Sequence, residues 1–271
     1  MRITIYDDFD LKKIAESGQC FRWEPLGTGG WRIPFRELCL RAVRVGNNTF
    51  ELDCGEEEYK RVWRGYFDLE ENYAAIRGRV EERADPYLFR AAEIGKGIRI
   101  LRQDLWETLA SFIVSQNRNI PIIRRSVELL CRAAGERRTD RAGEEYYSFP
   151  EPAAVAGMSG AELRDCALGY RCEYVRAAAE YALTGALEPS AFEGASDEEA
   201  VRELMRIRGV GLKVASCTAL FGLHRLNVFP VDTRIRKALK IEYPGGFPDA
   251  RYAPYRGVYQ QYMFALGPAR P

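Results

Sequence analysis

The sequence has few of the features that mark a membrane, secreted or metal-bound protein. No apolar run approaches the roughly eighteen residues needed to cross a bilayer, and residues 1–8 lack the apolar core of a signal peptide. The 7 cysteines are scattered without a C-x-x-C pair, and His224 is the one histidine. This pattern argues against disulfides, zinc and iron–sulfur clusters. We therefore expect a cytoplasmic protein without a transition metal.

The chain also has almost no excess charge of either sign. Its 40 basic residues face 39 acidic ones, so the formal net charge is +1. Bulk electrostatics therefore neither require nor exclude a polyanionic partner, and any nucleic-acid contact must depend on local groups. The acidic residues are dispersed and no pair is singled out by spacing, so hydrolysis of carbohydrate by paired carboxylates is not supported.

The pattern of what is present divides the 271 residues into two parts. In residues 1–95, short alternating segments separated by glycine and asparagine turns predict an antiparallel sheet. From about Gly97 the hydrophobic period becomes helical, so residues 96–271 are expected to form an α-helical domain. The predicted strands are Arg2–Tyr6, Cys20–Trp23, Trp31–Phe35, Leu38–Val45 and Thr49–Leu52.

The helical part carries start and stop signals. Asp104 is placed to cap one helix, and Pro121 suits the first turn of the next. A further helix is expected to stop at Gly185, and Ser196 with Glu199 forms a capping box. These signals predict several helices with defined ends.

Residues 197–222 predict a helix, a short turn and a second helix. Gly209 and Gly211 allow a sharp turn and leave backbone N–H groups exposed at a helix N-terminus, where a phosphate can dock. This helix-hairpin-helix pattern is only moderately specific, because G-x-G turns between helices also occur as plain structure.

Lys213 gives the hairpin its chemical interest. It lies in the first turn of the second helix. Asp232 lies 19 residues later in the sequence, shortly after Phe229-Pro230. A lysine amine held there suits a nucleophile, and a nearby aspartate can stabilise the cationic sugar that forms as a glycosidic bond breaks. The structural alternative is a solvated lysine, with Asp232 as the N-cap of a helix over residues 233–239. For Asp232 both interpretations can hold.

Four motifs of the chain resemble those of a known family. Residues 209–215 (GVGLKVA) with 230–232 (PVD) resemble the helix-hairpin-helix glycosylase superfamily. Residues 97–104 (GIRILRQD) with 17–23 (SGQCFRW) resemble its 8-oxoguanine DNA glycosylase branch. The similarity extends from residue 17 to residue 264. Four motifs in the family's order are stronger evidence than any one of them.

The resemblance implies a bifunctional DNA glycosylase and AP lyase that excises 8-oxoguanine from duplex DNA in base excision repair. The damaged nucleotide would be flipped out of the helix, Lys213 would attack C1′, and the Schiff base would undergo β-elimination with Asp232 as carboxylate partner. The implied fold is α+β, with an N-terminal antiparallel sheet domain like that of the TATA-binding protein before a helical glycosylase domain. The lesion pocket would lie between them.

The same resemblance assigns the base-binding residues. Gly18 would offer its carbonyl to the N7–H that 8-oxoguanine has and guanine lacks. Cys217 and Phe264 would stack on the two faces of the base, and Gln260 would bond to its Watson–Crick edge. Without the resemblance, Phe264 would be interpreted as core and Gln260 as surface, so these two assignments depend on it.

Further positions would contact DNA. Asn117 would enter the gap left by the flipped base, and Arg118 belongs to the same loop. Arg171 would contact the estranged base, whose acceptors suit an arginine if it is cytosine. Gly209 and Gly211 would meet a phosphate.

Two positions depart from the eukaryotic pattern of the family. Ile122 stands where that pattern has a second arginine that reads the opposite cytosine, which predicts weaker selectivity for the opposite base. Arg234 replaces a histidine that contacts phosphate and keeps a cation there. Both departures suggest a bacterial relative with relaxed selectivity for the base on the partner strand. Such a protein is expected in the cytoplasm, at the nucleoid.

No organic cofactor and no fixed metal is expected for this chemistry. A monovalent cation, sodium or potassium, would be able to bridge carbonyls of the 209–211 hairpin to a DNA phosphate. The expected partner is double-stranded DNA containing 8-oxoguanine, bound by a monomer away from any membrane.

Two other functions stay open at this point. A glycosylase of the same superfamily that acts on alkylated purines would lack lyase activity and the nucleophilic lysine. A non-enzymatic DNA-binding protein would use the hairpin only to hold phosphates, which would leave Gly18, Cys217 and Gln260 without a common purpose.

Overall fold

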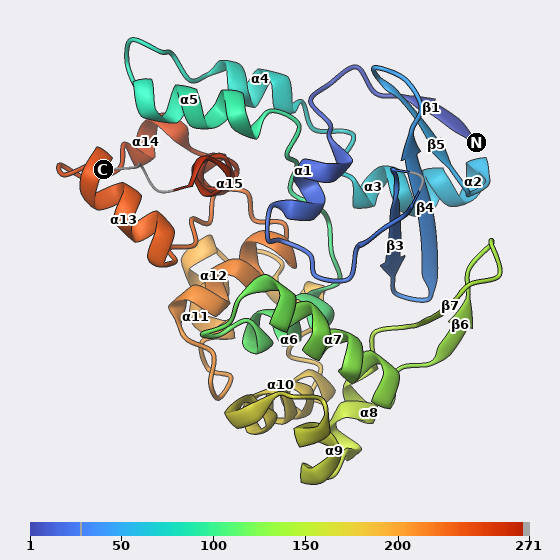
Figure 1. The fold of residues 1–271 in the computed structure, drawn as a ribbon. Helices are drawn as coiled ribbons and strands as arrows, with labels where there is room; N and C mark the ends of the chain where they lie inside the picture. Colours follow the sequence, from blue (N-terminus) through green and yellow to red (C-terminus); the bar gives the residue numbers. More distant parts are fainter. Residues whose placement is uncertain (28, 268–271) are drawn as a thin grey trace.

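A five-stranded antiparallel sheet lies at one side of the molecule (Figure 1). The computed structural model describes residues 1–27 and 29–267. The sheet has the order β1-β5-β4-β3-β2, and in the β3–β4 pair Ile33 lies opposite Leu40, with both side chains fully buried. Its strands are β1 (Arg2–Thr4), β2 (Glu24–Pro25), β3 (Trp31–Phe35), β4 (Leu38–Arg44) and β5 (Thr49–Leu52).

The strand predicted at Cys20–Trp23 is wrong, because the sheet gains only the short β2 after it. The side chains of this segment do not alternate between core and solvent: Phe21 packs against Phe112 in the helical core, whereas Trp23 packs in the sheet core. The segment therefore runs between two cores and is buried on both sides, which removes the alternation on which a strand prediction depends.

Helices follow the sheet, at positions that the local sequence pattern did not predict. They are α2 (Glu56–Glu58), the π-helical turn η1 (Tyr59–Trp63), α3 (Arg64–Tyr66), α4 (Tyr73–Gly78) and α5 (Pro86–Gly95), after the earlier α1 (Leu11–Glu16). Trp63 of η1, Tyr66 of α3 and Phe67, which follows α3, pack in the sheet core with Trp23. The hairpin β6 (Arg137–Thr139) and β7 (Glu145–Tyr147) forms a separate two-stranded sheet.

The predicted starts of the long helices are confirmed. The side chain of Asp104 accepts a hydrogen bond from the N–H of Glu107, and Ser196 and Glu199 form the reciprocal capping box. The helices are α6 (Leu105–Val114), α7 (Ile120–Ala134), α8 (Pro152–Gly157), α9 (Gly160–Asp165), η2 (Gly169–Arg171), α10 (Cys172–Leu183), η3 (Pro189–Phe192), α11 (Asp197–Leu204), α12 (Leu212–Phe221), α13 (Thr233–Glu242), α14 (Asp249–Tyr252) and α15 (Arg256–Leu266).

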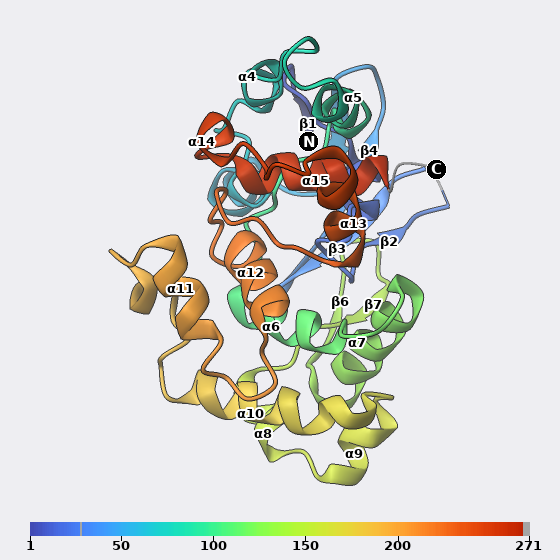
Figure 2. The ribbon, with the colours of Figure 1, turned by 90° about the vertical axis from the view of Figure 1, so that its left-hand side faces the viewer.

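Two hydrophobic cores divide the described chain, and they interleave along the sequence. Residues between Tyr73 and Ala92 contribute side chains to the larger, helical core rather than to the sheet core. Helix α15 lies between α5 above and α12 below (Figure 2), and Gly95 leaves room for the ring of Tyr262. The boundary near residue 95 stays a prediction. Within the described residues, no helix is both long and apolar enough to cross a membrane.

Residues 97–104 connect the two cores through a buried arginine. Arg99 is fully buried, and its guanidinium donates to Asp7 Oδ2 at 2.8 Å and to the backbone carbonyls of Asp8, Phe67, Asp68 and Glu71. Gly97 has φ +98°, and a Cβ there would lie 2.7 Å from the Cβ of Asp10. This motif therefore fixes how the N-terminal segment packs onto the helices.

Candidate active site

A pocket of about 140 Å³ lies where the two parts of the chain meet. Phe21 reaches it from the N-terminal part, Phe112 from α6, and Ser115 caps the C-terminus of α6. All six residues predicted for catalysis and base binding line it: Gly18, Lys213, Cys217, Asp232, Gln260 and Phe264. These residues come from the loop after α1, from α12, from the N-cap of α13 and from α15.

Lys213 lies in the first turn of α12, as predicted, and its amine is half-buried in the pocket wall. Its Nζ lies 3.4 Å from Ser115 Oγ and 4.9 Å from the centre of the Phe112 ring. No carboxylate of the described residues lies within ion-pair distance of this amine. The Cys217 thiol also lies beside this amine, and none of its described neighbours holds it in an ion pair, so the amine is free to approach a carbon atom placed in the pocket.

Asp232 caps α13, which confirms the structural interpretation of this residue. Its Oδ1 accepts a hydrogen bond from the N–H of Ile235 at 2.8 Å. Its Oδ2 makes no hydrogen bond to residues 1–27 or 29–267 and borders the pocket. One carboxylate oxygen is thus held by the helix while the other is available to a ligand, so capping does not compete with a catalytic role.

Cys217 lies one helical turn beyond Lys213 and is almost completely buried. Burial raises the pKa of its thiol to about 11, with Lys213 opposing the shift and Asp232 adding to it. The thiol is therefore neutral near pH 7. A neutral sulfur suits contact with the face of a flat aromatic ring.

Gly18 is held in place by its neighbour in the chain. The buried side chain of Gln19 donates to Ser17 Oγ and to the carbonyl of Arg99, both at 2.8 Å, and accepts from the N–H of Leu101. Gly18 itself has φ +77°, and a Cβ there would lie 3.3 Å from Phe264 Cε1. The pocket wall at Gly18 is therefore backbone held by side-chain hydrogen bonds.

Gln260 is 3% exposed, so the surface position expected from the local pattern alone is wrong. The pattern misled because α15 is buried on most sides, and Tyr259, Tyr262 and Met263 are buried with it. The Oε1 of Gln260 accepts from Gln261 Nε2 at 2.9 Å, which fixes the orientation of its amide. Phe264 packs against the helical core, as the local pattern alone predicts, and it also borders the pocket, as the resemblance implies.

The hairpin places its two glycines in different environments. Gly209 has φ +84°, and a Cβ there would overlap the ring of Tyr174. Gly211 is the N-cap of α12 with φ −92°, and nothing lies within 4 Å of where its Cβ would be. The carbonyl of Gly209 accepts from Gln116 Nε2 at 2.9 Å, so the hairpin is tied to the loop after α6.

The predicted DNA-contacting residues lie around the pocket, and of these Arg118 alone lines it. Asn117 is exposed with φ +51°, and its amide donates to Tyr170 Oη at 3.2 Å. Arg118 donates to Ser126 Oγ at 2.8 Å. Arg171 is buried, and its Nε donates to the carbonyl of Gln116 at 2.9 Å. Their contacts with DNA stay predictions.

Arg234, in the first turn of α13, lies beside the pocket residue Phe264. It is exposed, and its guanidinium lies 5.2 Å from the centre of the Phe264 ring. The sequence patterns gave no pocket role to Phe21, Phe112 or Tyr170, although Phe21 lies in the motif of residues 17–23. An aromatic residue in such a segment gives no signal from sequence that separates a pocket wall from the core.

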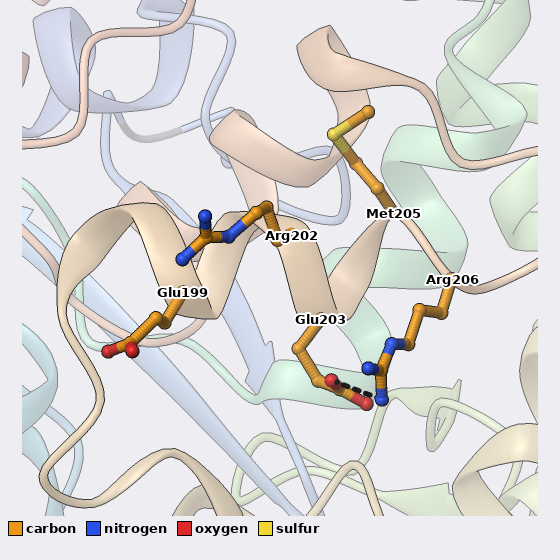
Figure 3. A pocket seen from close by; sticks show the side chains of 5 residues that line it. All are labelled: Glu199, Arg202, Glu203, Met205 and Arg206. Carbon is orange, nitrogen blue, oxygen red and sulfur yellow. Dashed lines mark ion pairs between the residues drawn. The ribbon is translucent and has the colours of Figure 1, made fainter.

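A second hollow, larger in volume, lies on α11. It contains none of the residues predicted for catalysis or base binding. Figure 3 shows Glu199, Arg202, Glu203, Met205 and Arg206 around it, with Glu203 paired to Arg206 at 2.9 Å. These side chains come from one helix and its end, they are mostly exposed, and their charges cancel locally. Among the described residues, no group of three or more His, Cys, Asp or Glu side chains could hold a metal ion.

The family model described as 8-oxoguanine DNA glycosylase, N-terminal domain, matches residues 2–109. The N-glycosylase/DNA lyase of Saccharomyces cerevisiae is 33% identical over 258 residues, which is 86% of this chain and 68% of the yeast protein.

Two solved structures are similar to this chain over nearly its whole length. The Clostridium acetobutylicum 8-oxoguanine glycosylase/lyase, crystallised with double-stranded DNA containing cytosine opposite 8-oxoG, superposes with a TM-score of 0.87 and 31% identity, covering 98% of this chain and 97% of that one. MBOgg1 in complex with a low-affinity DNA ligand gives a TM-score of 0.90 and 33% identity, covering 97% and 93%.

An antiparallel sheet domain followed by a helical domain with a lysine-bearing hairpin defines a glycosylase of the helix-hairpin-helix class. Within that class, the extent of the similarity decides the family. The chain belongs to the 8-oxoguanine DNA glycosylase family.

Proposed function

We propose that this protein is a bifunctional DNA glycosylase and AP lyase that excises 8-oxoguanine from double-stranded DNA in base excision repair. The observation that carries the proposal is the convergence of Gly18, Lys213, Asp232 and Gln260 on one pocket. A flipped nucleotide would place its sugar beside the amine and its base against the glycine and the amide.

In the first step the lone pair of Lys213 Nζ forms a bond to C1′, and the C1′–N9 bond breaks with its electron pair going to the base. Asp232 Oδ2 stabilises the positive charge that develops on the sugar. The amine then loses a proton, which neutralises the departing base. The C1′–O4′ bond breaks, O4′ takes a proton from water, and a Schiff base forms between C1′ and Lys213 Nζ. Loss of a C2′ proton expels the 3′ phosphate by β-elimination, which cleaves the strand.

Discrimination of 8-oxoguanine from guanine would depend on Gly18. Its carbonyl would accept the N7–H of the oxidised base, whereas guanine would present a lone pair there and leave the carbonyl unpaired. Gln260 would bond to the Watson–Crick edge, while Cys217 and Phe264 would cover the two faces of the base. The hydrogen bonds that hold Gln19 support this proposal, because a rigid carbonyl discriminates better than a mobile one.

The remaining predicted residues would bind the DNA around the lesion. The N–H groups of Gly209 and Gly211 would contact a phosphate, and Arg234 would contact another. Asn117 would fill the gap in the helix, and Arg118 would support the same loop. Arg171 would give up its hydrogen bond to the carbonyl of Gln116 and would contact the estranged base instead.

Two finer points belong to the same proposal. A sodium or potassium ion would bridge hairpin carbonyls to a phosphate; exchanging potassium for tetramethylammonium at constant ionic strength should then weaken DNA binding. Because its substrate is chromosomal DNA, the protein would act at the nucleoid. No organic cofactor takes part in the reaction.

The test uses labelled duplexes that carry either 8-oxoguanine or guanine at one position. The wild type should cleave the 8-oxoguanine strand without alkali and leave the guanine strand intact. Lys213→Gln should lose cleavage, whereas Lys12→Gln, at an exposed lysine of α1, should retain it. An 8-oxoguanine strand that stays uncleaved without alkali, or equal cleavage of the guanine duplex, would overturn the proposal.

A further inference from the structure

The solvent face of α13 is cationic over its whole length. Arg236, Lys237 and Lys240 are exposed, and at 3.6 residues per turn they fall within about 100° of one another around the helix axis. Ile235 and Ala238 occupy the opposite face and are buried. The acidic residue of the helix, Glu242, lies at its last position and on the side of the buried face.

None of these three cations makes an ion pair within residues 1–27 and 29–267, and the three lie together on one face of one helix. Helix α11 shows the contrast: it carries several acidic residues, and Glu203 neutralises Arg206 (Figure 3). With a net charge of +1 over the whole chain, a local concentration of unpaired cations is the part of the surface that attracts a polyanion.

The position of α13 joins this face to the lesion pocket. Its N-cap, Asp232, lines the pocket, and Arg234 in its first turn lies over the pocket residue Phe264. The helix then runs along the outer edge of the molecule (Figure 1). At a rise of 1.5 Å per residue, Arg236 and Lys240 are about 6 Å apart along the axis, so these two side chains can contact different phosphates of one strand.

We propose that Arg236, Lys237 and Lys240 form a second DNA-backbone surface, the α13 basic face, that binds phosphates flanking the extruded nucleotide without regard to sequence. The inference depends on the proposed function for its partner, double-stranded DNA. Its consequence is separate from catalysis: the face supplies affinity for undamaged DNA, which a protein of nearly zero net charge needs in order to search for a lesion.

The experiment compares two triple variants that remove the same charge. One is Arg236→Gln with Lys237→Gln and Lys240→Gln. The control is Arg61→Gln with Arg83→Gln and Arg164→Gln, at exposed arginines without ion pairs elsewhere on the described surface. Dissociation constants for an undamaged duplex are measured by fluorescence anisotropy over a series of salt concentrations, after circular dichroism has established that each variant is folded.

The slope of log K against log salt should fall by about 0.9 for each phosphate that the protein no longer neutralises, hence by up to about 2.7 for the α13 variant, and should not change for the control. Arg236→Lys with Lys237→Arg and Lys240→Arg should restore the wild-type slope, because charge and not side-chain shape is required. Equal slopes for the α13 variant and the control would overturn the inference.

Single-turnover excision of 8-oxoguanine at saturating protein separates this inference from the proposed function. If the inference is right, the α13 variant excises at the wild-type rate once it is saturated. If the wild type fails to excise 8-oxoguanine but the salt slopes still differ, the proposed function fails while the α13 basic face remains a DNA-binding surface.

Discussion

Replacement of Gly209 by alanine tests whether the hairpin requires a glycine. The residue has φ +84°, in the left-handed region, where a Cβ costs about 1–2 kcal/mol. The added Cβ would also overlap the ring of Tyr174, and overpacking of this kind costs about 1–3 kcal/mol. The two contributions predict a loss of about 2–5 kcal/mol in the free energy of unfolding.

Gly211 provides the matched control in the same turn. Its φ is −92°, which any residue adopts, and no atom lies within 4 Å of the position of a Cβ. Alanine is a poorer N-cap than glycine, so Gly211→Ala should cost about 0.5 kcal/mol. The difference between the two alanine variants therefore isolates the backbone conformation and the contact with Tyr174.

Urea unfolding followed by tryptophan fluorescence measures both variants, and the comparison is valid if the slope m is unchanged. Because the carbonyl of Gly209 accepts from Gln116, a displaced hairpin should also weaken DNA binding through the loop that holds Asn117. Equal free energies of unfolding for the two variants would refute the reasoning, since it would show that the turn accommodates a side chain at either glycine.

Three further predictions follow from single positions. Ile122→Arg should increase excision opposite cytosine relative to adenine, whereas the wild type should act almost equally on both; strong cytosine selectivity in the wild type would contradict this. Although His224 Nε2 lies 3.0 Å from Asp68 Oδ1, burial and the charge of Arg102 lower the pKa of this histidine to about 3. The unfolded chain therefore binds the extra proton below about pH 6.5, and stability should fall with decreasing pH by up to about 1.4 kcal/mol per unit down to about pH 3. His224→Gln should flatten that dependence in urea unfolding, and an unchanged dependence would assign it to other groups. Asp232→Asn should keep the cap and the stability while losing excision, whereas Asp232→Ala should lose about 1 kcal/mol as well; retained excision in Asp232→Asn would argue against its catalytic role.

Signals that act over a few residues could be interpreted from sequence alone. Asp104 and Ser196 cap helices because their side chains reach N–H groups three residues away, and this contact needs no other part of the chain. The hairpin was predictable for the same reason, since Gly209 marks a left-handed turn immediately before a helix. Once the two helix starts were predicted, so were the positions of Lys213 in the first turn of α12 and of Asp232 at the N-cap of α13.

Features set by distant packing could not be interpreted in this way. Cys20–Trp23 has the composition of a strand, but both its faces are covered by cores that other segments build. The local pattern placed Gln260 on the surface, but α15 packs against α5, α13 and α14, and the side chain is buried. Its assignment to the pocket came from the family resemblance, because a buried amide is not visible in periodicity.

The cationic face of α13 also could not be predicted from the composition of the chain. A net charge of +1 gives no indication that Arg236, Lys237 and Lys240 gather on one face without acidic partners. That arrangement becomes visible only when the helix and its buried side are known.

Covalent trapping with borohydride tests the central claim most directly. The wild type and Lys213→Gln are incubated with a duplex that contains one 8-oxoguanine, and the adduct is located by peptide mapping. The account predicts a reduced Schiff base on Lys213 in the wild type and no adduct in the variant. A wild type that binds the duplex without forming an adduct, or an adduct on another residue, would contradict it.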